Sequence, residues 1–219
     1  MKLIRLSVIL VSLTLLTINH ADAQQEFPPP QGKGRVVVVI SGMLGPSHDQ
    51  SVTQQIAQLG YDAVLFDGNR IVGTHGAALR TVILQAQGMP HALPGKVGLV
   101  GFSLGGGMVL YYGPLLTDLV AVVVAWSPET DFIHNVPGFV SRLALPVLMF
   151  AGESDTYKNC CLAATARILA AAAVGHQFEL VTYPNANHDF IYGGAHYNPQ
   201  VYAAAMQRTA AKLAQYIGH

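Results

Sequence analysis

The chain has 219 residues, of which 51% are hydrophobic and 11% are charged, and its formal net charge is zero. This length suffices for one α/β domain with a complete core and is short for two domains. The composition excludes a disordered chain, and the balanced charge, without a cluster of Lys or Arg, gives no electrostatic basis for a nucleic-acid partner.

The first 23 residues have the pattern of a secretory signal peptide. Lys2 and Arg5 precede an apolar run at 6–18, and Ala21-Asp22-Ala23 is an A-x-A cleavage site. The run is shorter than the roughly 20 residues of a membrane-spanning helix, so an uncleaved membrane anchor is the weaker alternative. We therefore expect a mature chain that starts near Gln24, is secreted or periplasmic, and has no stable membrane insertion.

Residues 24–34 contain three consecutive prolines and two glycines and are predicted to be a linker or an extended lead-in to the domain. After this segment, short β-rich runs alternate with stretches of helical periodicity. The predicted strands are 35–40, 63–66, 96–100, 119–125, 147–151 and 177–182, and the predicted helices are 51–59, 77–87, 104–112, 162–173 and one from about 199 that Asn198 caps. This alternation predicts a single α/β domain over 35–219, with a mostly parallel sheet and helices on both faces. Functional side chains of such sheets collect in the loops after the carboxyl ends of the strands.

The segment Gly101-Phe102-Ser103-Leu104-Gly105 follows a predicted strand and opens a predicted helix. It matches G-x-S-x-G, the sharp turn that raises a nucleophilic serine above the edge of the sheet. The helix that follows points its amino end at the site, where its partial positive charge favours a developing oxyanion. Ser103 is the predicted nucleophile, and the alternative is a glycine-rich turn with a chance serine.

A nucleophilic serine needs a base and a third group that orients the base, and in this topology they follow in the order acid, histidine. Asp155 comes after the fifth predicted strand and His188 after the sixth, so they are the predicted acid and base. Glu129 and Glu153 also follow strands and are the rival acids, while His196 is the rival base. The other histidines lack this placement and are predicted to be solvated or locally bonded: His48, His75, His91, His134, His176 and His219.

An oxyanion hole requires two backbone N–H donors. The first is predicted to be that of Leu104, directly after the nucleophile, and the second that of Met43, in the loop 41–45 after the first strand. Both roles belong to the backbone, so the side chains carry little information. The alternative for Met43 is a residue that lines the pocket or the core.

Cys160 and Cys161 are the only cysteines and are adjacent in the sequence. Their Cα atoms are about 3.8 Å apart across a trans peptide, whereas ordinary disulfides span roughly 4.4–6.8 Å. We therefore interpret them as helix residues, with a redox-active pair or an intermolecular link as alternatives. Neither paired CxxC nor HExxH spacing is present, and no metal or cofactor is predicted.

Together these motifs resemble the dienelactone hydrolase family from about Arg35 to Ile217. The likeness is carried by 36–45, 59–67, 96–107, Gly152-Glu153-Ser154-Asp155, Asn187-His188-Asp189-Phe190 and 197–209. The resemblance implies an α/β-hydrolase fold and the hydrolysis of a carboxylic ester through an acyl-enzyme.

The chain departs from that family at two positions. Family members typically carry Cys as the nucleophile where this chain has Ser103, and the archetypal enzymes carry a Glu in the loop after the first strand where this chain has Gly42. A serine nucleophile has no resting thiol for a Glu to contact, so the absence of that Glu is consistent with the absence of the Cys. The two changes together argue against dienelactone itself as the substrate. Arg70 and Arg80 are candidates for the arginines that bind an anionic substrate in the family.

The interval 127–146, where lids of this fold are usually inserted, is about 20 residues long and can hold a loop or a short helix but no large cap domain. We therefore expect an open or shallow site for small or extended esters. The aromatic residues that could line it, or belong equally well to the core, are Trp126, Phe132, Phe139 and Tyr157. The alternatives are a peptidase or thioesterase with the same triad, or a catalytically inactive ligand-binding protein on the same scaffold.

Overall fold

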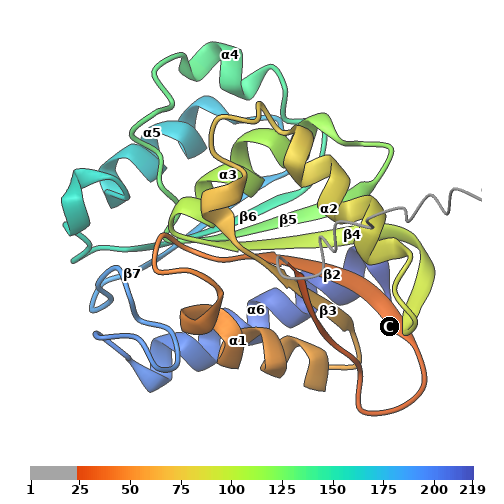
Figure 1. Ribbon diagram of the computed structural model, residues 1–219. Helices are drawn as coiled ribbons and strands as arrows, with labels where there is room; N and C mark the ends of the chain where they lie inside the picture. The colour runs from red at the N-terminus through yellow and green to blue at the C-terminus, as the bar shows by residue number, and fades with distance from the viewer. Residues whose placement is uncertain (1–23) are drawn as a thin grey trace, which may run out of the picture.

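The computed structural model describes residues 24–219 (Figure 1), and the predicted signal peptide lies outside the described residues. The strands are β1 (Gln24–Phe27), β2 (Gly34–Ile40), β3 (Asp62–Phe66), β4 (Ala92–Phe102), β5 (Val120–Trp126), β6 (Val147–Gly152) and β7 (Phe178–Tyr183). The α-helices are α1 (Pro46–Gln58), α2 (Ala77–Gln87), α3 (Leu104–Tyr112), α4 (Val136–Val140), α5 (Ala163–Ala172) and α6 (Pro199–Ile217). Every strand and helix predicted after residue 34 is present, with ends that differ by a few residues.

The strands form one seven-stranded sheet in the order β1-β3-β2-β4-β5-β6-β7. Only β1 runs antiparallel to its neighbour, and the pairs from β3 through β7 are parallel. The register pairs Ile40 with both Phe66 and Gly101, so the carboxyl ends of β2, β3 and β4 meet at the same edge. The loops that leave this edge carry the predicted site residues.

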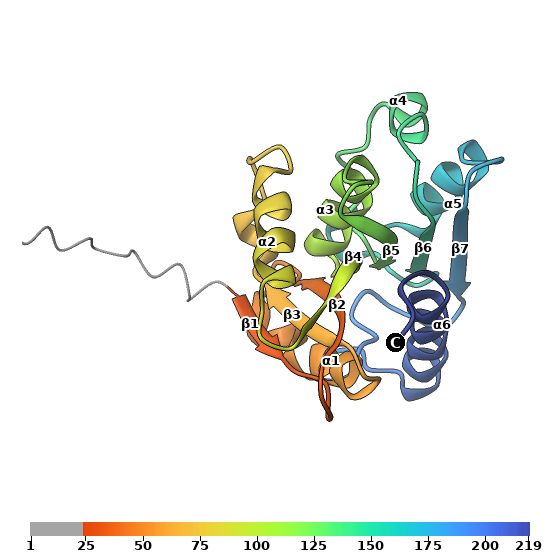
Figure 2. The same cartoon turned by 90° about the vertical axis from the view of Figure 1, so that its right-hand side faces the viewer.

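Helices cover both faces of the sheet, as Figures 1 and 2 show: α1 and α6 lie on one face, and α2, α3 and α5 on the other. Alternate residues of β2 pack into two separate cores. Val36, Val38 and Ile40 belong to the core under α2 and α3, whereas Val37 and Val39 belong to the core with α1 and α6. Burial on both faces is the reason for the continuous valine run of this parallel strand.

The segment 24–34, predicted to be a linker or an extended lead-in, begins with the ordered strand β1, so its first four residues are part of the sheet and not a free linker. Strand β1 pairs with the edge strand β3, with Gln24 opposite Phe66 and Phe27 opposite Ala63. Its sequence, Gln-Gln-Glu-Phe, lacks the alternation of a typical strand. The order of this segment therefore comes from pairing with the otherwise open edge of β3.

The interval 127–146 holds only the five-residue helix α4 and no cap domain. Within residues 24–219, none of the helices combines the length and the apolar character that crossing a membrane requires.

Candidate active site

Ser103 occupies the turn between β4 and α3 with φ 51° and ψ −116°, a strained conformation for a residue other than glycine. Its backbone is held from three sides. The N–H of Ser103 donates to the carbonyl of Trp126 at 3.0 Å, and its own carbonyl accepts from the N–H groups of Gly107 and Glu129, each at 2.9 Å. The strain is therefore maintained by β5 and by the first turn of α3.

The two glycines of the motif are required by the space around the turn. A Cβ atom at Gly101 would collide with the carbonyl oxygen of Gly105, and a Cβ atom at Gly105 would collide with the carbonyl oxygen of Ile40. Both obstacles are backbone atoms that cannot move aside. The same steric constraint is the reason that the G-x-S-x-G pattern predicts a sharp strand-to-helix turn.

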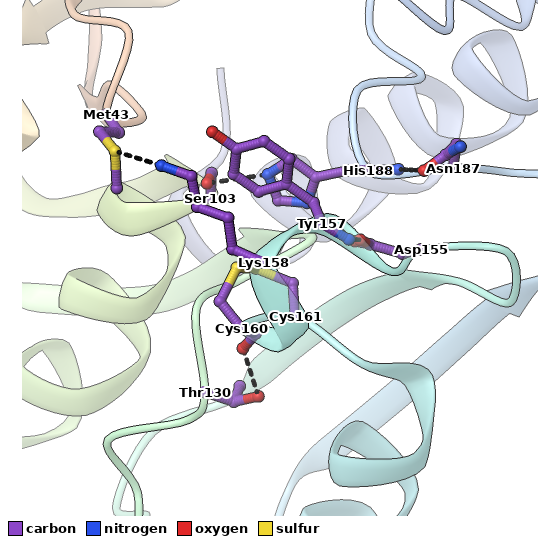
Figure 3. Close-up of a disulfide and its surroundings, with 10 residues drawn as sticks. All are labelled: Met43, Ser103, Thr130, Asp155, Tyr157, Lys158, Cys160, Cys161, Asn187 and His188. Atoms are coloured by element: carbon purple, nitrogen blue, oxygen red, sulfur yellow. Dashed lines mark hydrogen bonds and ion pairs between the residues drawn. A yellow bond between two sulfur atoms is a disulfide. The ribbon is translucent and has the colours of Figure 1, made fainter.

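The structure brings the three predicted triad residues into one hydrogen-bonded chain (Figure 3). The Nε2 atom of His188 is 2.9 Å from the Oγ atom of Ser103, and its Nδ1 atom is 2.8 Å from the Oδ2 atom of Asp155. Asp155 is buried, and its Oδ1 atom accepts the N–H of Tyr157 at 3.0 Å. Because a carboxylate only accepts hydrogen bonds, the His188 proton is assigned to Nδ1, which leaves Nε2 free to accept the serine proton.

The rival acids and the rival base occupy other positions. Glu153 forms an ion pair with Arg167 on the surface. Burial raises the pKa of Glu129, and the charge of Asp131 adds to the increase. The Nδ1 atom of His188 is bonded to Asp155, so Glu129 does not occupy the position of the acid. His196 lines the pocket but is not part of this hydrogen-bonded chain.

Tyr157 packs against the imidazole of the predicted base. The rings of Tyr157 and His188 are stacked with centroids 4.6 Å apart and an interplanar angle of 11°. The next residue, Lys158, extends its Nζ atom to 3.6 Å from the Sδ atom of Met43, across Ser103 in the view of Figure 3. The loop after β6 thus restrains the imidazole and spans the rim of the pocket.

The loop after β2 presents Met43 at the pocket, where the predicted second oxyanion donor belongs. The N–H of Gly42 is unavailable for this role because it donates to Asp49 Oδ2 at 2.8 Å. The carbonyl of Met43 accepts from the side chain of Asn69 at 3.2 Å, which restrains the peptide between Met43 and Leu44, the one after the peptide that carries the Met43 N–H. Leu104 is the first residue of α3, so its N–H has no partner within the helix.

The site opens into a pocket of about 440 Å³. The pocket is lined by Gly42, Met43, Leu44, His48, Asp49, Phe102, Ser103, Trp126, Ser127, Thr156, Tyr157, Asn187, His188, Asp189, Ile191, Ala195 and His196. Of the interval 127–146, only Ser127 contributes, so α4 forms no lid. Of the four aromatic candidates, Trp126 and Tyr157 line the pocket, whereas Phe132 and Phe139 pack around Tyr111 in the core under α3.

Neither candidate arginine for an anionic substrate lies at the pocket. Arg80 forms a two-fold contact with Asp118, with Nη2 to Oδ2 at 2.7 Å, on the surface of α2. Arg70 is exposed at the end of the short 3₁₀ helix after β3. Lys158, by contrast, contacts the lining residue Met43.

A second hydrogen-bonded chain lies in the pocket wall. The Nδ1 atom of His48 is 3.1 Å from Asp49 Oδ1, and its Nε2 atom is 3.2 Å from Asp189 Oδ2. The outer ends are fixed by backbone groups, since Asp49 accepts the N–H of Gly42 and Asp189 accepts the N–H of Ala195, both at 2.8 Å. The bond to Asp49 is of the local kind that the sequence predicts for His48. The bond to Asp189 ties the first turn of α1 to the loop that carries His188, and no spacing in the sequence indicates it.

We expect this chain to contribute stability that disappears in alkaline solution. The hydrogen bond and charge of Asp49, helped by Asp189 and partly offset by burial, raise the pKa of His48 from 6.5 to about 9. Because the pKa is higher in the folded state, the contribution is complete below about pH 6.5 and is lost as the pH rises through about 9. Thermal unfolding of wild type and His48→Gln is therefore expected to differ most near pH 6 and to converge above pH 9.

The matched control for this prediction is His196→Gln, which changes a histidine of the same pocket that lies outside the chain. Its melting temperature should follow that of wild type at every pH. A constant difference between wild type and His48→Gln from pH 6 to pH 10 would show that the charge of His48 contributes nothing.

Cys160 and Cys161 are joined by a disulfide in the loop before α5, which corrects the prediction that they are helix residues. Lys158 and Asn159 have φ values of 47° and 56°, in the left-handed region, and Leu162 has extended backbone with ψ 133°, so α5 starts only at Ala163. The Sγ atom of Cys161 lies within 4.8 Å of ligand atoms of Asp155 and His188. The disulfide therefore packs beside the triad (Figure 3), and the carbonyl of Cys160 accepts the N–H of Thr130 at 2.8 Å.

The parallel sheet, the strained serine after β4 and the loops at the carboxyl edge define the protein as an α/β hydrolase. The model of the dienelactone hydrolase family matches residues 69–217, and the chain belongs to this family.

Individual relatives agree with this assignment. A protein of Synechocystis sp. named "Putative carboxymethylenebutenolidase" is 27% identical over 239 residues, covering 90% of this chain and 94% of the relative. Among solved structures, the "Putative Dienelactone Hydrolase" of Klebsiella pneumoniae superimposes with a TM-score of 0.73 at 21% identity, over 88% of this chain and 92% of the other. An esterase of Pyrococcus furiosus gives a TM-score of 0.69 at 15% identity, over 89% and 92% of the two chains. At these identities the two structures establish the fold.

Proposed function

We propose that the protein is a secreted or periplasmic serine esterase that cleaves carboxylic esters through an acyl-enzyme on Ser103. The observation that carries the proposal is the continuous hydrogen-bonded chain from Ser103 through His188 to Asp155 at the floor of a pocket. Nucleophile, base and orienting acid are within direct contact, which is the geometry that acyl transfer by serine requires.

In the first step, Ser103 Oγ attacks the ester carbonyl carbon while its proton passes to His188 Nε2. The carbonyl oxygen becomes negatively charged in the tetrahedral intermediate, and the N–H groups of Leu104 and Met43 donate hydrogen bonds to it. The bond to the alcohol then breaks, and His188 returns the proton to the leaving oxygen. Water attacks the acyl-enzyme in the same way, giving its proton to His188, and the acid leaves as the proton returns to Ser103. Asp155 stabilises the imidazolium in both steps without taking its proton.

The surroundings of Ser103 support a serine that works without a companion carboxylate at position 42. A Cβ atom at Gly42 would lie 3.3 Å from the Cβ atom of Ser103 and 3.3 Å from the carbonyl oxygen of Phe102. This space is tight for any side chain. The nearest acid, Asp49, turns its Oδ2 atom to the N–H of Gly42 and its Oδ1 atom to His48.

The size and lining of the pocket favour small esters. A volume of about 440 Å³ lies in the lower part of the range of small-molecule sites, roughly 300–1,000 Å³. Phe102, Trp126 and Ile191 provide an apolar wall, and Lys158 contacts Met43, another lining residue. The acyl group or the alcohol group is therefore expected to be short, or to extend out of the pocket.

The test is the turnover of p-nitrophenyl esters with acyl chains from C2 to C12, compared with a matched thioester and a matched anilide. We expect turnover of the esters, with the highest kcat/KM at the short chains. Faster turnover of the thioester or the anilide would assign the triad to a thioesterase or a peptidase. A folded protein that turns over none of them would be a binding protein on the hydrolase scaffold, and the proposal would be wrong.

A further inference from the structure

A second cluster of titratable side chains lies at the opposite end of the sheet from Ser103. Glu26 of β1, Asp62 at the start of β3 and His91 just before β4 bring two carboxylate oxygens and a ring nitrogen within 4.8 Å of one another. Asp62 and His91 stand at the amino ends of their strands, whereas the proposed active site follows the carboxyl ends. The cluster is therefore separate from the esterase machinery.

Asp62 is the member of the cluster whose burial is not compensated by a contact among the described residues. Its side chain is completely buried, and within residues 24–219 neither carboxylate oxygen has a hydrogen-bond partner. A buried carboxylate without a partner is costly, and a neighbouring carboxylate increases the cost. Burial, and then the charge of Glu26, raise the pKa of Asp62 to about 7, whereas His91 lowers it. The cluster thus sets two carboxyl groups against a single imidazole.

The other two members are already oriented. The Oε1 atom of Glu26 lies 3.0 Å from the Nδ1 atom of His91 and accepts the backbone N–H of His91 at 3.3 Å. These contacts fix the carboxylate of β1 against the imidazole before β4. The side chain of His91 is 44% exposed and that of Glu26 is 20% exposed, so the cluster opens to solvent on the side of His91. An ion has a path of entry, and water has room to complete its coordination.

We propose that Glu26, Asp62 and His91 form a binding site for one divalent transition-metal ion, with zinc as the best match. Zinc binds carboxylate oxygen and imidazole nitrogen at roughly 2.0–2.2 Å, and a set of three such ligands with one water is an ordinary zinc environment. The imidazole disfavours calcium and magnesium, which prefer oxygen ligands throughout. Two ligand atoms on a tetrahedral ion are about 3.4 Å apart, so small side-chain rotations bring the three atoms into place.

The ion would join three separate parts of the chain. Glu26 belongs to the four-residue edge strand β1, which pairs only with β3. A metal held jointly by Glu26, Asp62 and His91 fastens this strand to β3 and to the start of β4. Its effect is on the stability of the sheet edge, since an ion that binds the folded state alone raises the melting temperature.

The proposal is tested by calorimetric titration of the EDTA-treated protein with zinc chloride alone, together with thermal unfolding. Wild type should bind one equivalent, and its melting temperature should rise with zinc. Asp62→Asn and His91→Ala should each weaken binding at least tenfold. His134→Ala, which removes an exposed histidine outside the cluster, is the matched control and should bind as wild type does.

A second measurement separates the metal site from a purely structural role. In EDTA, Asp62→Asn should be at least as stable as wild type, because it removes an unpartnered buried carboxylate. If wild type shows no stoichiometric binding, or if Asp62→Asn binds zinc as tightly, the proposal is overturned, and a proton shared between Glu26 and Asp62 accounts for the cluster. Ester turnover, which depends on the other end of the sheet, is not the readout.

Discussion

Replacement of Ser103 by alanine is expected to lower kcat/KM for the best p-nitrophenyl ester by roughly 10⁴–10⁶, as in other serine triads. The variant loses the nucleophilic oxygen, which lies 2.9 Å from His188 Nε2, so attack must come from water without a covalent intermediate. Alanine also fits the strained turn no worse than serine does, and the fold should be retained. Steady-state turnover and the melting temperature, measured on the same samples, check both expectations.

The control for this prediction is Ser141→Ala, which removes a hydroxyl at the end of α4, away from the pocket. Its turnover should stay within a factor of two of wild type. Turnover by Ser103→Ala within tenfold of wild type would mean that another group performs the attack.

Substitution of Asp155 by asparagine is expected to lower kcat/KM by roughly 10⁴. The carboxylate is buried and accepts from both His188 Nδ1 and the N–H of Tyr157, so it fixes the tautomer in which Nε2 can take the serine proton. An amide at the same position can donate to Nδ1 and stabilise the opposite tautomer. It also removes the negative charge that stabilises the imidazolium.

Two matched variants decide whether Asp155 alone is the acid. Glu153→Gln disrupts a surface ion pair with Arg167, and Glu129→Gln removes a partly buried carboxyl group near His188. Each should retain kcat/KM within about tenfold of wild type. If Glu129→Gln loses as much as Asp155→Asn does, the assignment of the acid to Asp155 is wrong.

The strands and helices after residue 34 could be predicted because each carries its own local signal. The valine run of β2 is buried on both faces, and α6 begins where Asn198 accepts the N–H of Val201 at 3.2 Å. The positions of Ser103, Asp155 and His188 followed from the same signals, because parallel strands place their subsequent loops at a common edge.

The features that the sequence does not indicate depend on partners far away in the chain. Strand β1 has no pattern of its own and is ordered by the edge of β3. His48 contacts Asp189 at a sequence separation of 141, and no short motif encodes this contact. Glu26, Asp62 and His91 are also far apart in the sequence, so they match no ligand-spacing motif. For this reason the sequence predicts no metal.

The prediction for the adjacent cysteines was wrong for a different reason. Their prediction as helix residues rested on the short Cα separation of neighbours, which is 3.8 Å in the structure as well. The backbone of this segment is left-handed at Lys158 and Asn159 and extended at Leu162, and of these three residues only Asn159 is of a type that favours the left-handed region.

The most direct test of the serine esterase assignment is the reaction of the protein with a fluorophosphonate, followed by intact mass measurement and peptide mapping. The phosphorus centre reacts with a serine that a neighbouring base activates. We expect one adduct per chain, on the peptide that contains Ser103, with no adduct in Ser103→Ala and much slower labelling in His188→Ala. A folded wild type that forms no adduct, or an adduct that persists in Ser103→Ala, would contradict the assignment.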